Sequence, residues 1–171
     1  MKSGFAAIVG RPSAGKSTLL NALCGEKAAI TSPAPQTTRN VIRGIVNFPE
    51  GQVVFLDTPG YHQSEKKFNS YLRRIVHRTL DEADIILYVI DGTRMPGQEE
   101  FSIMKILSRV KAPIIAAVNK IDAAPKYLPE IRGLIRMNIN PAAIINISAL
   151  KAAHLDVLTA AVIDICPEGD I

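Results

Sequence analysis

The sequence predicts an α/β fold in which a doubly wound, mostly parallel sheet carries helices on both faces. Short apolar runs recur along the chain, and segments with apolar residues at helical spacing lie between them. This alternation indicates βαβ units with right-handed crossovers. A chain of 171 residues is long enough to bury one core, so we expect a single domain over residues 1–171.

The expected elements follow from these runs. Buried strands are predicted at 5–10, 53–57, 84–91, 113–119 and 142–148. Helices are predicted at 17–25, 68–83, 99–110 and 154–166. Residues 39–48 alternate more loosely, which favours an edge strand paired with 53–57 through a turn at 49–51. Ligands of such sheets bind beyond the carboxyl ends of the strands, so the loops there are the candidate site.

Composition narrows the class of protein. Apolar residues make up 47% of the chain and charged residues 21%, as is typical of a globular protein. A net charge of +4 favours an anionic partner, but only weakly. The two cysteines have neither metal-ligand spacing nor a disulfide framework, which indicates a reduced, cytoplasmic setting. No apolar run approaches the roughly 20 residues of a membrane span. The methionines Met95, Met104 and Met137 are expected to fill space in the core or in loops.

The first predicted strand leads into GRPSAGKS, residues 10–17, with a predicted helix directly after it. Glycines let the backbone wrap closely around a phosphate, and the helix N-terminus favours an anion. Lys16 is expected to reach the β- and γ-phosphates of a nucleotide, and the Ser17 hydroxyl to bind Mg²⁺. The remaining nucleotide-binding residues predicted here are Gly10, Ser13, Ala14, Gly15 and Thr18.

The base is expected to be read by NKID, residues 119–122, after the strand at 113–119. The Asp122 carboxylate can accept both N1–H and the exocyclic amine of guanine, and adenine has no hydrogen at N1. A site built on such a pair discriminates by roughly 10⁴-fold. Asn119 can donate to the guanine carbonyl or N7, or brace the phosphate loop, and Lys120 can lay its aliphatic stem along the ring.

A further loop, ISALK at 147–151, follows the next strand. We expect the Ala149 amide to contact the guanine carbonyl and Ser148 to fix the loop. Leu150 completes the predicted nucleotide contacts.

Two segments are predicted to sense the γ-phosphate. DTPG at 57–60 places Asp57 where its carboxylate can hold Mg²⁺ through water, and the Gly60 amide faces the γ-phosphate. The loop at 31–40 is rich in Pro and Thr, and Thr38 is the expected second protein ligand of Mg²⁺, with Thr37 as the fallback. Lys16, Thr38 and Gly60 are the predicted catalytic residues.

The motifs GRPSAGKS, QTTRN, DTPG, NKID and ISALK together resemble the Era-type GTPases of the TrmE–Era–EngA group, over essentially the whole chain. The resemblance implies a Mg²⁺-dependent switch that hydrolyses GTP to GDP and acts in assembly of the small ribosomal subunit. It also implies that 16S rRNA is bound by a C-terminal KH domain, which we expect this chain to lack. A cytoplasmic location is implied, and peripheral contact with the inner membrane is compatible with it.

The chain departs from the general pattern at two places. Ser13 stands where the family has an asparagine that helps to bind potassium, which argues against potassium stimulation. Tyr61 and His62 follow DTPG where many GTPases have a water-orienting glutamine, and Gln63 comes two positions late. We therefore expect slow intrinsic hydrolysis.

Three alternatives remain at this point. They are another GTPase of the same group, a P-loop nucleotide kinase, and a non-catalytic RNA-binding module. Guanine preference over adenine separates the first from the second. The third is supported only by the positive charge, because the sequence shows no aromatic platform on which bases could stack. Separately, a ribosome-facing surface could include Arg73, Arg74 and Arg78, although a solvated helix face explains these arginines better.

Overall fold

The computed structural model describes residues 1–25, 41–58, 74 and 77–169. Within these ranges the strands form one sheet in the order β2-β3-β1-β4-β5-β6. All neighbouring pairs are parallel except β2 and β3, so the predicted α/β fold is confirmed. The strands are β1 (Lys2–Val9), β2 (Val41–Phe48), β3 (Gly51–Asp57), β4 (Ile85–Asp91), β5 (Ile114–Asn119) and β6 (Ala143–Asn146).

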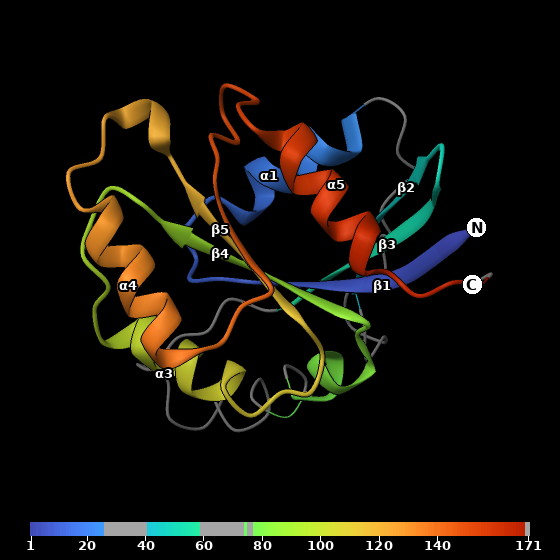
Figure 1. The fold of residues 1–171 in the computed structure, drawn as a ribbon, viewed down its shortest axis with the longest axis horizontal. Coiled ribbons are helices and arrows are strands. Elements are labelled where there is room, and N and C mark those ends of the chain that lie inside the picture. The colour runs from blue at the N-terminus through green and yellow to red at the C-terminus, as the bar shows by residue number, and fades with distance from the viewer. Residues whose placement is uncertain (26–40, 59–73, 75–76, 170–171) are drawn as a thin grey trace.

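Helices cover both faces of the sheet, as Figure 1 shows. Every residue of β4 is buried, and its side chains alternate between two apolar layers. One layer is closed by α1 (Lys16–Cys24) and α5 (Leu155–Ile165). The opposite layer is closed by α3 (Gln98–Leu107), α4 (Leu128–Asn138) and the helical residues 77–82.

The predicted edge hairpin is present. β2 pairs antiparallel with β3, from Val41 opposite Asp57 to Phe48 opposite Gly51. The turn at 49–50 joins them. The pairing fixes where β3 ends, and therefore where Asp57 lies.

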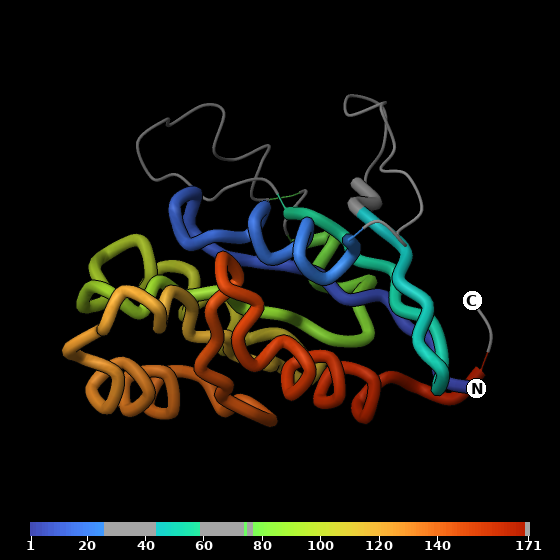
Figure 2. Tube along the Cα trace, turned by 90° about the horizontal axis from the view of Figure 1, so that it is seen from above, coloured from blue at the N-terminus to red at the C-terminus, as the bar shows by residue number. Residues whose placement is uncertain are grey.

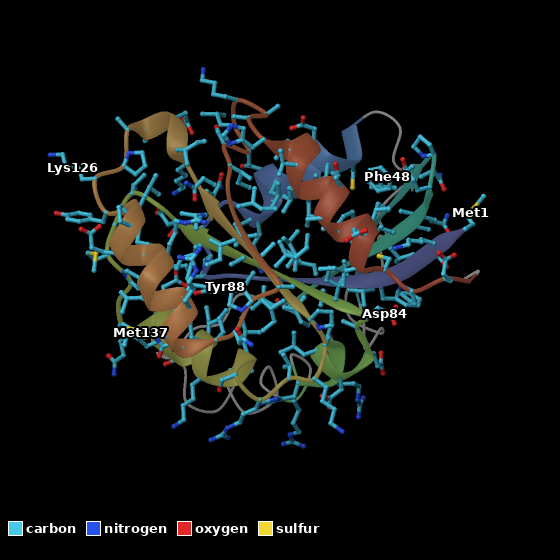
Figure 3. All side chains as sticks on the ribbon, viewed as in Figure 1. Met1, Phe48, Asp84, Tyr88, Lys126 and Met137 are labelled. Atoms are coloured by element: carbon cyan, nitrogen blue, oxygen red, sulfur yellow. The ribbon has the colours of Figure 1, made fainter. Side chains whose placement is uncertain are left out.

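In the described ranges, the sequence did not predict α4, with its buried Ile131 and Ile135, or the short 3-10 helix η2 (Ile121–Ala123). Met137 lies on α4 and is 83% exposed, so the expectation that it fills core or loop was wrong (Figure 3). Met104, by contrast, is buried, and Met95 is exposed in the loop before α3. Most of the helix predicted at 68–83 lies outside the described residues, apart from its end at 77–82.

The carboxyl ends of the parallel strands meet at one edge of the sheet. Figure 2 shows the N-terminus at one end of the molecule and α4 at the other, and the Gly169 amide, in the last described residue, donates to the Met1 carbonyl. No helix in the described ranges has the length and apolar character needed to cross a bilayer.

Candidate functional site

The loop between β1 and α1 has the backbone expected of a phosphate-binding loop. The Ala14 amide donates to the Arg11 carbonyl over 3.0 Å, and the Leu19 amide donates to the Gly15 carbonyl over 2.9 Å as α1 begins. Gly15 has φ +102°, and a Cβ there would overlap the Asn119 side-chain amide. A Cβ at Gly10 would lie 2.6 Å from the Val89 carbonyl. Both glycines of the motif are therefore required by geometry.

Lys16 turns inward from this loop toward the end of β3. Its side chain is only 10% exposed, and Nζ donates to the Thr58 carbonyl over 2.8 Å. Nζ also lies 3.4 Å from Oδ1 of Asp57. The hydroxyl of Thr58 donates to the Ile8 carbonyl over 2.7 Å, which ties the end of β3 to β1. Ser17 is exposed in the first turn of α1.

Asn119 joins the phosphate loop to the loop after β6. Its Nδ2 donates to the Ala14 carbonyl over 2.9 Å, and its Oδ1 accepts from the Ala149 amide over 2.9 Å. Of the two roles predicted for Asn119, the structure shows the second, because its side chain braces the phosphate loop at Ala14. The Ala149 amide makes a hydrogen bond to Asn119, and its contact to the guanine carbonyl stays a prediction.

Ser148 orients the carboxylate of Asp122. The Ser148 hydroxyl donates to Oδ1 of Asp122 over 2.8 Å and accepts from the Lys151 amide over 3.0 Å. Two backbone hydrogen bonds between Ser148 and Ala153 close this loop. Leu150, at its tip, is 71% exposed. Asp122 therefore keeps one oxygen fixed by the loop while the residue itself stays accessible.

Lys120 lies across the site and has two partners. Its Nζ donates to the Ser13 carbonyl over 2.8 Å and to Oδ2 of Asp91 over 3.1 Å. Burial raises the pKa of the Asp91 carboxyl, but hydrogen bonds from Thr93 and Lys120 outweigh it and hold that pKa below its ordinary value. Asp91 was missed from the sequence, although it ends a buried strand as Asp57 does.

A second buried polar group lies between β4 and α3. The Tyr88 hydroxyl donates to Oε1 of Glu100 over 2.8 Å, and burial raises the pKa of the Glu100 carboxyl to about 7. Nε of Arg11, in the phosphate loop, lies 3.5 Å from Oε2 of Glu99 on the same helix. No sequence pattern singled out this group, because Tyr88 and Glu100 are separated by a loop and belong to different elements.

Several predicted site residues lie outside the described ranges. They are Thr38 with its fallback Thr37, Gly60, and the three residues Tyr61, His62 and Gln63. Arg73 is also outside, whereas Arg74 and Arg78 are exposed. The roles given to the residues outside the ranges stay predictions.

The described residues gather the predicted loops at one edge of the sheet. Hydrogen bonds connect the 10–17, 119–122 and 147–151 segments, and Lys16 connects the first of these to Asp57. The described ranges hold no cluster of three or more His, Cys, Asp or Glu side chains suited to a metal. One carboxylate and one hydroxyl are nevertheless enough for Mg²⁺, which keeps several of its waters.

Comparison with known proteins identifies a family and relatives that share this arrangement of motifs. Residues 5–120 match the family described as "50S ribosome-binding GTPase". The GTPase Era of Borreliella burgdorferi is 44% identical over 172 residues, a match that covers 100% of this chain and 59% of the relative. This chain thus spans about three fifths of the length of that curated relative.

Two solved structures are similar along the whole chain. An Aquifex aeolicus Era variant bound to GDP and AlF4⁻ has a TM-score of 0.82 and 39% identity, over 99% of this chain and 59% of that one. An Era complex with MgGDPNP and nucleotides 1506–1542 of 16S ribosomal RNA has a TM-score of 0.81 and 38% identity, over 100% of this chain and 59% of that one.

Proposed function

Because this chain belongs to the family of 50S ribosome-binding GTPases, we propose that its residues 1–171 form one domain that binds and hydrolyses GTP as a molecular switch. The observation that carries the proposal is the position of Asn119, which joins the phosphate loop to the loop that orients Asp122. A polyphosphate at one end and a purine ring at the other fit this arrangement. The kinase and RNA-module alternatives have no comparable support.

The proposed base recognition centres on Asp122. Its carboxylate accepts from N1–H and the exocyclic amine of guanine, and the Ser148 hydroxyl keeps it in place. The aliphatic stem of Lys120, held at Nζ by Ser13 and Asp91, forms one wall for the ring. In this loop, the Ala149 amide, which donates to Asn119 in this structure, and the exposed residue Leu150 are the candidates for a contact to the guanine carbonyl.

Magnesium fits the residues at the phosphate end. Ser17 is an exposed residue at the start of α1, and Asp57 ends β3 beside Lys16. We assign the Ser17 hydroxyl as one protein ligand, Thr38 as the second on the basis of the sequence, and Asp57 as the carboxylate that holds the ion through water. Bound Mg²⁺ would neutralise charge on the phosphate oxygens. Ser13 has a shorter reach than asparagine, so we do not include potassium.

Hydrolysis in this proposal depends on position and charge. Lys16 and the amides of the phosphate loop neutralise the negative charge that develops between the β- and γ-phosphates. After the γ-phosphate leaves, Thr38 and Gly60 lose their partner, which releases the two sensor segments. Tyr61 lacks the amide that orients water in many GTPases, so a slow intrinsic rate is expected.

The cellular role is proposed from the relatives. The Era structure with a 16S rRNA fragment supports action on the small ribosomal subunit, although the family description names the 50S particle. The resemblance assigns the RNA contact to a KH domain, which would lie outside these 171 residues. A cytoplasmic location is kept on the same basis, whereas membrane contact gains no support from the comparisons.

Titration with GDP, a GTP analogue and an ATP analogue tests the proposal. We expect guanine nucleotides to bind and ATP analogues to fail. Asp122→Ala and Asp122→Asn should both weaken guanine binding strongly, by analogy with the roughly 10⁴-fold discrimination of paired polar sites. Asp122→Asn should also shift preference toward xanthine, because the amide reverses one donor–acceptor pair.

The matched control is Asp81→Asn, which changes an exposed carboxylate on the helical segment 77–82. It should bind as the unchanged protein does. Unaltered guanine affinity in both Asp122 variants would remove the base-reading assignment.

A further inference from the structure

Asp91 lies where β4 and β5 end side by side. In the register of the two strands, Asp91 is opposite Asn119, the first residue of the base-recognition motif. Asp91 is only 5% exposed, whereas its partner Lys120 has a partly exposed side chain. A buried carboxylate is retained at such a place only if it is paired, since an isolated one is strongly destabilised.

Both oxygens of this carboxylate are held. Oδ1 accepts from the Thr93 amide over 2.8 Å and from the Thr93 hydroxyl over 2.6 Å. Oδ2 accepts from Nζ of Lys120 over 3.1 Å. The position of the ammonium group is therefore set by the end of β4 as well as by Lys120 itself.

The same ammonium group reaches the phosphate loop. Nζ donates to the Ser13 carbonyl over 2.8 Å, so the chain of contacts runs from Asp91 through Lys120 to Ser13. Lys120 has a left-handed backbone, with φ +72°. Because Nζ is held by two partners, the stem has little freedom to leave the site.

We propose that Asp91 is a positioning residue for the guanine nucleotide: its carboxylate holds Lys120 across the site and against the phosphate loop. This inference rests on the proposed function, because it concerns the affinity of that same site. Asp91 does not touch the nucleotide and acts only through the ammonium of Lys120. Losing the carboxylate would free the lysine stem and loosen the Ser13 contact.

The test is a double-mutant cycle measured by GDP titration calorimetry. Asp91→Asn keeps the shape of the side chain and removes the charge, and we expect GDP affinity to fall by about tenfold, the lower range for close charge pairs. Lys120→Met keeps an apolar stem and removes the ammonium. Adding Asp91→Asn to Lys120→Met should change the affinity by less than about twofold, because the partner is already gone.

A merely structural role would give another pattern. If Asp91→Asn lowered affinity equally in both backgrounds, the effect would not pass through Lys120 and the inference would be overturned. Glu168→Gln is the matched control, because it removes a carboxylate that pairs with the N-terminal ammonium over 3.5 Å at an exposed site. Its GDP affinity should match that of the unchanged protein.

The outcomes for the two proposals are separable. If the unchanged protein fails to bind GDP, the proposed function fails. If it binds GDP and responds to Asp122→Asn but not to Asp91→Asn, only the inference on Asp91 fails. Should Asp91→Asn unfold below the assay temperature, Thr93→Val removes the 2.6 Å hydroxyl bond instead, and must lower GDP affinity in the same direction.

Discussion

The hydroxyl of Tyr88 donates a 2.8 Å hydrogen bond to Oε1 of Glu100, joining β4 to α3 in the buried layer of the fold. Figure 3 shows Tyr88 in the interior, among the side chains of that layer. Glu100 is 3% exposed, and burial raises its pKa to about 7 against the opposing effects of the Tyr88 bond and the charges of Arg11 and Arg94. The carboxyl thus binds a proton in the folded protein more readily than in the unfolded chain.

This pKa makes stability depend on pH. Between pH 4.5 and about 7 the folded state binds more protons than the unfolded state, so the free energy of unfolding falls as the pH rises. The difference between about 7 and 4.5 corresponds to about 3 kcal/mol. In Glu100→Gln the free energy of unfolding should vary little over this pH interval. Above neutral pH it should exceed that of the unchanged protein, as measured by denaturant unfolding at a series of pH values.

The control for that series is Glu130→Gln, which alters an exposed carboxylate on α4. It should keep the pH profile of the unchanged protein. Parallel profiles for Glu100→Gln and the unchanged protein would show that Glu100 titrates at its ordinary value.

Gly15→Ala should disable the phosphate loop. The new Cβ would meet the Asn119 amide at a backbone with φ +102°, so the 2.9 Å contact from Asn119 to Ala14 has to break. Strain of this kind costs about 1–3 kcal/mol, and we expect a loss of GDP affinity of at least tenfold in calorimetry. Gly133→Ala is the control: its Cβ would have no atom within 4 Å, and it should stabilise α4 by up to about 1 kcal/mol. Wild-type GDP binding by Gly15→Ala would contradict the steric reading.

Thr38→Ala should separate nucleotide binding from turnover. A Mg²⁺ ligand that acts only with the γ-phosphate leaves GDP affinity unchanged when it is removed, while phosphate release slows by about 10²-fold or more. Release can be followed continuously under single-turnover conditions. Thr37→Ala is the neighbouring control, and slower release in that variant alone would transfer the ligand role from Thr38 to Thr37.

The buried face of α4 should contribute strongly to stability. Ile131 is fully buried, and Ile131→Ala should lower the free energy of unfolding by about 2–5 kcal/mol. Met137→Ala, at an exposed position of the same helix, should stay within about 0.5 kcal/mol. Urea unfolding of both variants measures the difference, and equal losses would mean that α4 packs on another face.

The sequence predicted the strands and the loops of the site well, because both are encoded locally. A run such as 84–91 is apolar on both faces, which indicates a buried strand. The glycines and lysine of 10–17 have the spacing that is typical of a phosphate-binding loop. The helix α4 was missed because Pro125, Pro129 and Gly133 discourage a helical interpretation. Pro129 in fact occupies the first turn, where a missing N–H costs nothing, and Ile131 and Ile135 have helical spacing.

What could not be predicted depends on register between strands. Asp91 becomes a partner of Lys120 only because β4 and β5 pair so that Asp91 faces Asn119. Likewise, no local pattern shows that the side chain of Asn119 donates to the Ala14 carbonyl and at the same time accepts from the Ala149 amide. Such contacts belong to the assembled sheet, and an alternation of apolar runs does not specify them.

The bonds of Asn119 also set an order of events during synthesis of the chain. Asn119 holds a carbonyl 105 positions earlier and an amide 30 positions later. A nascent chain displays its GRPSAGKS segment early, but the side chain that braces it emerges much later, and the last amide later still. If the proposed nucleotide site needs this brace, capture of a nucleotide waits until nearly the whole domain has been translated.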